Sequence, residues 1–101
     1  MSRVKRLLYR LRLPRDIANL VAGLHPQLKR KIKASFQELL SNPRSGKPLK
    51  DELDGFWSYR VGRHRIVYRL SENRFVDIYA IGPREEIYEE MLRWVGREQT
   101  K

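Results

Sequence analysis

Residues 56–68 read FWSYRVGRHRIVY, and this stretch decides the fold. Aromatic and β-branched residues on both sides of Gly62-Arg63 are typical of strands, and the glycine indicates a tight turn between them. We therefore expect antiparallel strands over residues 56–61 and 64–70. After a longer turn signal at residues 71–74, residues 75–81 have the same character and predict a third strand. The centre of the chain is thus predicted to be an antiparallel meander.

Strand alternation sorts the side chains of this meander onto two faces. One face is apolar and aromatic, and consists of Trp57, Tyr59, Val61, Ile66, Tyr68 and Leu70. The other face would gather Arg60, Arg65 and Arg69, with Arg84 just past the third strand. Because a sheet needs only one buried face, we expect the second face to form a concave basic surface. Guanidinium groups match phosphate oxygens in a bidentate way, so this surface is suited to phosphate.

The N-terminal half predicts a strand followed by two helices. Residues 6–13 alternate between apolar and basic side chains, which predicts a strand that could add Arg10 or Arg12 to the arginine face. The spacing then becomes helical, with an apolar stripe of Ile17, Leu20, Val21 and Leu24. A second helix is expected after His25-Pro26, with an apolar stripe of Leu28, Ile32, Phe36, Leu39 and Leu40. A short connection makes the pair a helical hairpin.

The remaining segments complete the predicted topology. Residues 42–48 include two prolines and a glycine and are expected to be a loop. After Gly82-Pro83, the spacing of Ile87, Met91 and Val95 predicts a C-terminal helix of about three turns. The predicted fold class is α+β with the order β-α-α-β-β-β-α, an antiparallel sheet with an N-terminal helical hairpin and a C-terminal helix.

Composition limits the classes of function. The 101 residues are enough for a single domain, expected over residues 1–101, and they contain no cysteine. This excludes disulfides, Cys-ligated metals and a thiol nucleophile, and two histidines leave little for any other metal site, so we expect no metal and no cofactor. Without a long apolar run or a signal-like start, we expect a soluble, cytoplasmic protein that does not bind membranes.

The net charge of +10 points to a polyanion as partner, although basic charge can also serve solubility alone. Basic side chains that could contact such a polyanion, for example RNA, are Lys29, Arg30, Lys33, Lys47, Lys50, Arg63 and Arg69. For the group at residues 29–33, a merely solvated helix face is the alternative.

Three motifs resemble the RelE/ParE toxin superfamily of prokaryotic type II toxin–antitoxin systems. They are Lys47-Pro48-Leu49 with Leu53-Asp54-Gly55, the hairpin at residues 56–68, and the ending Gly82-Pro83-Arg84 with Tyr88. The RelE branch, which we favour, implies a ribosome-dependent mRNA endonuclease. In that branch the 2′-OH attacks the adjacent phosphorus without a metal and gives a 2′,3′-cyclic phosphate. A cognate antitoxin with an acidic segment, the ribosome and mRNA are the implied partners.

The resemblance also implies roles for individual residues. Arg65 would bind the scissile phosphate and stabilise the transition state, and Arg84 would stabilise the phosphate or protonate the leaving group. Arg60 matches a basic position on the second strand. Tyr88 would stack on the substrate nucleotide, although packing beside Leu92 is an equal alternative for it.

The proton acceptor is not assigned by the sequence. Many active relatives place two lysines where this chain has Ser58 and Arg60, and the histidine that often precedes the last arginine is Pro83 here. Candidates are His64, Glu52 and Asp54. These departures keep a second function open: ParE-like toxins share the fold, lack the nuclease residues and poison DNA gyrase as binding proteins.

Overall fold

A meander of three long strands forms the centre of the molecule. The computed structural model describes residues 8–99, with the side chains of residues 8–96. The meander consists of β3 (Phe56–Val61), β4 (His64–Leu70) and β5 (Phe75–Pro83), and its neighbouring strands are antiparallel. The meander was predicted from its aromatic and β-branched residues, and the bounds of the first two strands are confirmed. The third strand extends two residues beyond its predicted end at Ile81.

The edge strand β1 (Arg10–Arg12) corrects the predicted sheet. It pairs in parallel with β5 in a five-stranded sheet of order β1-β5-β4-β3-β2, in which β2 is the short strand Lys47–Pro48. The sheet is therefore mixed, and the prediction of a purely antiparallel sheet was wrong. Alternation reveals a strand and its faces, but strand direction depends on how the crossover returns the chain to the sheet. Of the predicted strand at residues 6–13, residues 6 and 7 lie outside the described part.

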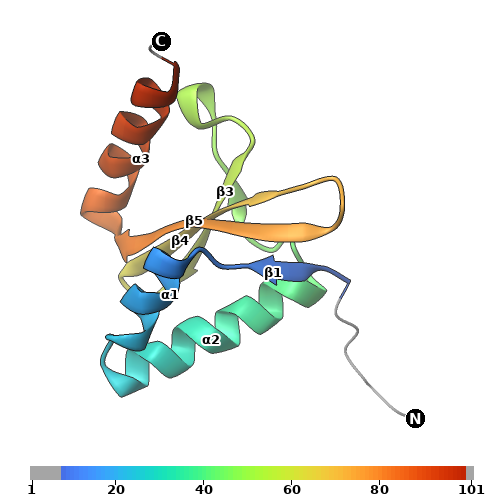
Figure 1. Cartoon of the computed structure of the whole chain (residues 1–101), viewed down its shortest axis with the longest axis vertical. Coiled ribbons are helices and arrows are strands. Elements are labelled where there is room, and N and C mark those ends of the chain that lie inside the picture. The colour runs from blue at the N-terminus through green and yellow to red at the C-terminus, as the bar shows by residue number, and fades with distance from the viewer. Residues whose placement is uncertain (1–7, 100–101) are drawn as a thin grey trace.

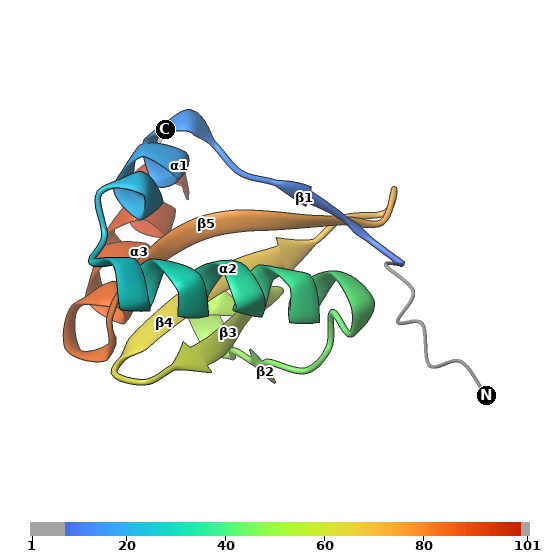
Figure 2. The same cartoon turned by 90° about the horizontal axis from the view of Figure 1, so that it is seen from below.

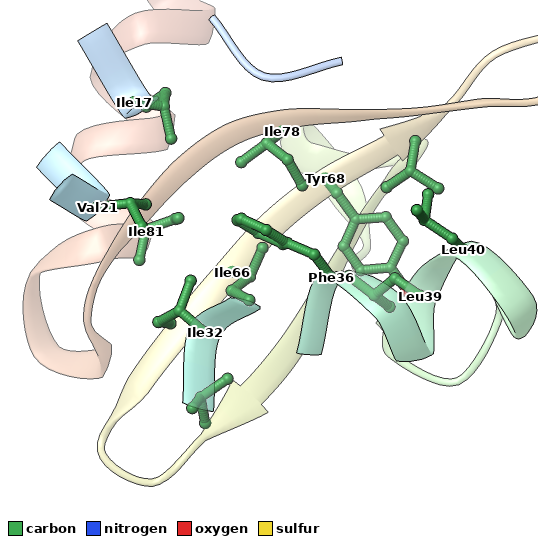
Figure 3. Packing of buried hydrophobic residues seen from close by; sticks show 12 residues of the cluster. Ile17, Val21, Ile32, Phe36, Leu39, Leu40, Ile66, Tyr68, Ile78 and Ile81 are labelled. Atoms are coloured by element: carbon green, nitrogen blue, oxygen red, sulfur yellow. The ribbon is translucent and has the colours of Figure 1, made fainter. Parts of the chain in front are cut away.

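Two helices cover one face of the sheet. They are α1 (Arg15–Ala22) and α2 (Pro26–Ser41), which form the predicted hairpin. At the start of α2, Pro26 occupies the first helical position and the His25 ring accepts a hydrogen bond from the backbone of Gln27 at 3.2 Å. The apolar stripe of α2 packs on the sheet, with Phe36 directed toward Ile66 and Tyr68 (Figure 3). Figure 2 shows α2 crossing in front of the sheet.

The segment after α2 is more ordered than expected. Within the predicted loop, β2 (Lys47–Pro48) pairs with β3, and a 3₁₀ turn, η1 (Asp51–Leu53), follows. The buried Tyr68 hydroxyl holds this segment, since it donates to the Pro43 carbonyl at 2.7 Å and accepts from the Gly46 amide at 3.2 Å. A Cβ on Gly46 would lie 2.5 Å from that hydroxyl, so only glycine fits there. Burial raises the pKa of Tyr68 to about 12.

The third helix, α3 (Arg84–Gln99), covers the opposite face and is longer than the predicted three turns (Figure 1). Its residues Ile87, Met91 and Val95 form a second core with Phe56 and Val67 of the sheet. The expectation that only one face is buried was therefore wrong. The sheet has helices on both faces, and the basic surface is confined to what α3 leaves uncovered.

A β-bulge in β5 shapes this second face. Val67 of β4 pairs with Ala80 while Tyr68 pairs with Ile78, which leaves Tyr79 without a partner in β4. The extra residue brings both Tyr79 and Ala80 into the core under α3. There the Tyr79 ring meets Phe56 edge to face, with ring centroids 5.0 Å apart.

Candidate functional site

Four arginines line one cavity at the tip of the β3–β4 hairpin. The cavity has a volume of about 230 Å³, and we call it the arginine cavity; its lining residues are Arg60, Gly62, Arg63, Arg65, Arg84 and Glu85. The residues come from the ends of two strands, the turn between them and the first turn of α3. Arg60, Arg65 and Arg84, which the sequence singled out, are thus brought together.

The backbone fixes the walls of this cavity. Arg60 and Arg65 are direct cross-strand partners, and Gly62 makes the intervening turn with a φ of 61°, which favours glycine. The Arg84 amide donates to the Arg63 carbonyl at 3.0 Å, so the start of α3 is attached to the hairpin turn. The Arg60 side chain donates through Nε to the Gly62 carbonyl at 3.4 Å. Hairpin and helix therefore hold the four guanidinium groups together.

The electrostatics of the cavity favour an anion. Like charges that face each other across strands destabilise a sheet, and Arg60 faces Arg65. Within the described residues, none of the four arginines forms an ion pair. The Nε of Arg65 is buried and has no hydrogen-bond partner in the structure. A phosphate would offset the repulsion and accept hydrogen bonds from several guanidinium groups at once.

Tyr88 lies beside the cavity but does not line it. Its side chain is half-buried against the second core, and its hydroxyl is hydrogen-bonded to the Ser58 hydroxyl at 2.7 Å. Ser58 precedes Arg60 by two residues and therefore shares its face of β3. The tyrosine is thus a packing residue that also has a fixed ring near the arginines.

The three predicted proton acceptors do not line the cavity. Alternation along β4 puts His64 on the face of Ile66 and Tyr68, away from Arg65. Glu52 and Asp54 precede β3, and about 13 Å of strand separates Phe56 from Arg60. The carboxylate that does line the cavity is Glu85. The sequence analysis did not single out Glu85 as a site residue, although its position directly after Arg84 was a usable signal.

The other predicted basic residues are spread over the surface. Arg63 lines the cavity, whereas Arg69 lies at the opposite end of the face, with its guanidinium 5.3 Å from the centre of the Phe56 ring. Arg12 does not join them, because it pairs with Asp77 at the β1 edge. Lys47 and Lys50 are exposed around β2, and Lys29, Arg30 and Lys33 lie on α2.

Two kinds of feature are absent from the described part of the chain. Among the side chains of residues 8–96, no three Asp, Glu or His residues form a cluster that could hold a metal ion. In the same part of the chain, no helix has the length and apolar character needed to cross a membrane.

Comparison with known proteins points to toxins. The family model described as "ParE toxin of type II toxin-antitoxin system, parDE" matches residues 7–88. The chain is 42% identical over 55 residues to Toxin RelE of Mycobacterium tuberculosis, which is 52% of this chain and 57% of that protein. It is 39% identical over 59 residues to Toxin RelG of the same organism, or 56% of this chain and 68% of RelG. The match thus spans little more than half the length of RelE.

Solved structures cover more of the chain. The RelBE2 toxin–antitoxin complex from Mycobacterium tuberculosis superimposes with a TM-score of 0.66 at 30% identity, over 79% of this chain and 95% of the matched one. A mutant of the E. coli toxin RelE in the free state gives a TM-score of 0.69 at 20% identity, over 86% of this chain and 97% of that one. The second similarity supports the fold alone.

Proposed function

Because this chain belongs to the ParE toxin family of type II toxin–antitoxin systems, within the RelE/ParE superfamily, we propose that it is a RelE-like toxin that cleaves mRNA on the ribosome. The observation that carries this proposal is the arginine cavity with its unpartnered, buried Arg65 Nε. RelE and RelG, the curated relatives, favour the RelE branch. A phosphodiester is the anion that such a site would meet in RNA.

In the proposed reaction, the arginines bind the scissile phosphate and stabilise the charge that develops on it. The 2′ oxygen forms a bond to phosphorus while the bond from phosphorus to the 5′ oxygen breaks. The products are a 2′,3′-cyclic phosphate and a 5′-OH end. Arg65 and Arg84 contact the phosphate from β4 and α3, and Arg60 contacts it from β3. Arginine stays protonated, so the proton of the 2′-OH needs another acceptor.

We assign that acceptor to Glu85. It is the carboxylate among the residues that line the arginine cavity, and it is exposed at the start of α3. Its carboxylate oxygens can accept a proton, which the guanidinium groups around it cannot do. Glu85 takes the proton of the 2′-OH and later loses it to water, and the 5′ oxygen is protonated by solvent. The atoms of the step therefore balance without a metal.

Tyr88 is proposed as a positioning residue for the nucleotide. Its ring is held by the second core and by the hydrogen bond to Ser58, so its orientation is fixed before substrate binds. A fixed aromatic ring beside a phosphate site is suited to stacking on a base. Its substitution by phenylalanine would remove the hydroxyl contact but keep the ring.

A cognate antitoxin is the proposed protein partner. The RelBE2 relative is a toxin–antitoxin complex, and this chain has a net charge of +10. An acidic segment of the antitoxin would be attracted to the arginine cavity and would compete there with phosphate. Inhibition would then result from occupation of the site.

The test is cleavage in a translating extract. Purified protein should produce mRNA 5′ ends at fixed positions within codons, and Arg65→Ala should abolish them. Arg44→Ala is a matched control, since Arg44 is exposed and does not line the cavity. Loss of cleavage in both variants, or in neither, would contradict the proposed role of the cavity.

The second candidate is a ParE-like gyrase poison. It is favoured by the description of the family model, by Ser58 and Arg60 in place of two lysines, and by Pro83 in place of a histidine. Intact mRNA together with accumulating gyrase–DNA adducts would establish this function and exclude cleavage.

A further inference from the structure

A groove with acidic walls lies between α1 and α3, over β5. It has a volume of about 1020 Å³ and shares no lining residue with the arginine cavity. We call it the acidic groove. Its floor includes Tyr79 and Ala80, and its two walls include Leu20 of α1 and Trp94 of α3. The proposed cleavage reaction makes no use of this groove.

The apolar part of the groove is exposed, and its tryptophan packs against Tyr79. Leu20 and Trp94 are 43% and 37% exposed, which is high for large apolar side chains. Leu20 was predicted to face the core with Ile17 and Val21, and the structure instead turns it toward this groove. The Trp94 ring meets Tyr79 at an angle of 69°, with centroids 5.6 Å apart. Tyr79 packs against the second core, so one side of the Trp94 ring is already in contact with the protein before a ligand covers the other side.

The charge of the groove is opposite to that of the whole molecule. Asp16, Asp77 and Glu90 line it together with a single cation, Arg12. Arg12 donates through Nη2 to Asp77 at 3.0 Å, a hydrogen bond that raises the pKa of Arg12 and neutralises Asp77. Asp16 on one wall and Glu90 on the other have no ion pair within the described residues. In a chain with ten excess positive charges, this groove is locally negative.

We propose that the acidic groove binds a segment of a partner protein in which apolar side chains stand next to lysine or arginine. The apolar side chains cover Leu20 and Trp94, and the cations lie near Asp16 and Glu90. The face of the Trp94 indole adds an attraction for a cation. Charge complementarity selects this occupant, because an acidic segment would be repelled here and attracted to the arginine cavity. The two sites therefore select segments of opposite charge.

The test uses a short synthetic amphipathic peptide of leucine and lysine, and a leucine and glutamate counterpart. NMR of the ¹⁵N-labelled protein should show saturable shifts of the Trp94 indole N–H and of amides in α1 with the lysine peptide. The double variant Asp16→Asn with Glu90→Gln should weaken binding by about threefold or more at low salt. The control Glu72→Gln with Glu86→Gln removes two exposed carboxylates that do not line the groove and should leave affinity unchanged.

A second variant tests the apolar contact. Leu20→Gln should lower the affinity for the lysine peptide by about fivefold, because the substitution removes part of the apolar surface that the peptide buries. Leu20 is exposed, so the variant should keep the melting temperature of the parent. The proposal is wrong if the lysine peptide shifts the NMR signals of residues on other surfaces and not those of the groove, or if both peptides bind the groove equally well. Concentration-dependent shifts of the same residues without peptide would identify a second copy of the chain as the occupant and would also overturn it.

Discussion

Arg60 and Arg65 face each other across two strands, an arrangement that a sheet selected for stability alone would avoid. The unpartnered Nε of Arg65 has the same implication, since buried donors are normally paired. Both features would be explained by an anion bound between the arginines, such as the scissile phosphate of the proposed reaction. Sequence alternation predicted that the two arginines share a face, because side chains alternate between the two faces of any strand whatever packs around it. Glu85 was missed because its proximity to them depends on how α3 begins.

Glu85 and Glu86 provide a matched pair for testing proton transfer. Both are exposed in the first turn of α3, but only Glu85 lines the cavity. Glu85→Gln should lower the cleavage rate by about 100-fold or more, as expected when a general base is lost, and should leave ribosome binding intact. Glu86→Gln changes the charge equally and should cleave normally. Single-turnover cleavage and ribosome co-sedimentation measure the two effects, and equal losses in both variants would exclude the assignment.

The Tyr68 hydroxyl should make a measurable contribution to stability. Tyr68→Phe leaves the buried Pro43 carbonyl without its donor and should reduce the free energy of unfolding by about 1–3 kcal/mol. Urea unfolding at pH 8 measures this difference. The effect should not depend on the arginine cavity, which Tyr68 does not line.

The same hydroxyl predicts a pH dependence. The folded pKa of Tyr68 is raised to about 12, above the value of about 10 in the unfolded chain, so its contribution is complete below pH 10. Above pH 10 the unfolded state releases the proton more readily, and stability falls as the pH rises toward 12. The stability difference between the parent and Tyr68→Phe should therefore shrink across this interval. A difference that stays constant from pH 8 to 12 would contradict the raised pKa.

At the scale of elements, the sequence predicted what local periodicity encodes and missed what depends on contacts across the sheet. The three meander strands and α2 have strong patterns and appear close to their predicted bounds. The parallel pairing of β1 and the two-residue β2 are set by neighbouring strands, not by their own residues. The burial of the second face was missed because it was expected to be an exposed basic surface. Alternation places Phe56 and Val67 on that same face, and the apolar stripe of α3 packs on them.

The turn between β3 and β4 should control the arginine cavity through backbone geometry. Gly62 has a φ of 61°, and a Cβ there would meet no atom within 4 Å. Gly62→Val should therefore destabilise through backbone conformation alone, by about 1–2 kcal/mol, and should disturb the alignment of Arg60 with Arg65. Gly62→Asn should be tolerated better, because asparagine adopts positive φ more readily. Thermal melts and cleavage rates should be measured for both variants. Equal losses in Gly62→Val and Gly62→Asn would contradict a conformational origin of the destabilisation.

At the scale of the whole molecule, the excess of positive charge predicts salt-sensitive binding to ribosomes. Contacts to phosphate release counterions, so ribosome affinity should fall by about 10-fold or more between about 50 and 200 mM salt. Arg63→Gln should reduce the slope of log affinity against log salt by about one, if this cavity residue contacts one phosphate. Filter binding across a salt series measures the slope. A flat response would show that the charge is incidental to binding.

α3 contributes residues to both the arginine cavity and the acidic groove. Its first turn supplies Arg84 and Glu85 to the arginine cavity, and two turns later Glu90 and Trp94 form a wall of the acidic groove. The hydrogen bond from the Arg84 amide to the Arg63 carbonyl attaches the N-terminal end of α3 to the hairpin turn. A ligand that displaced the groove end of α3 would therefore act on a helix whose other end carries Arg84 and Glu85. We therefore expect occupation of the acidic groove and the geometry of the arginine cavity to influence each other through α3.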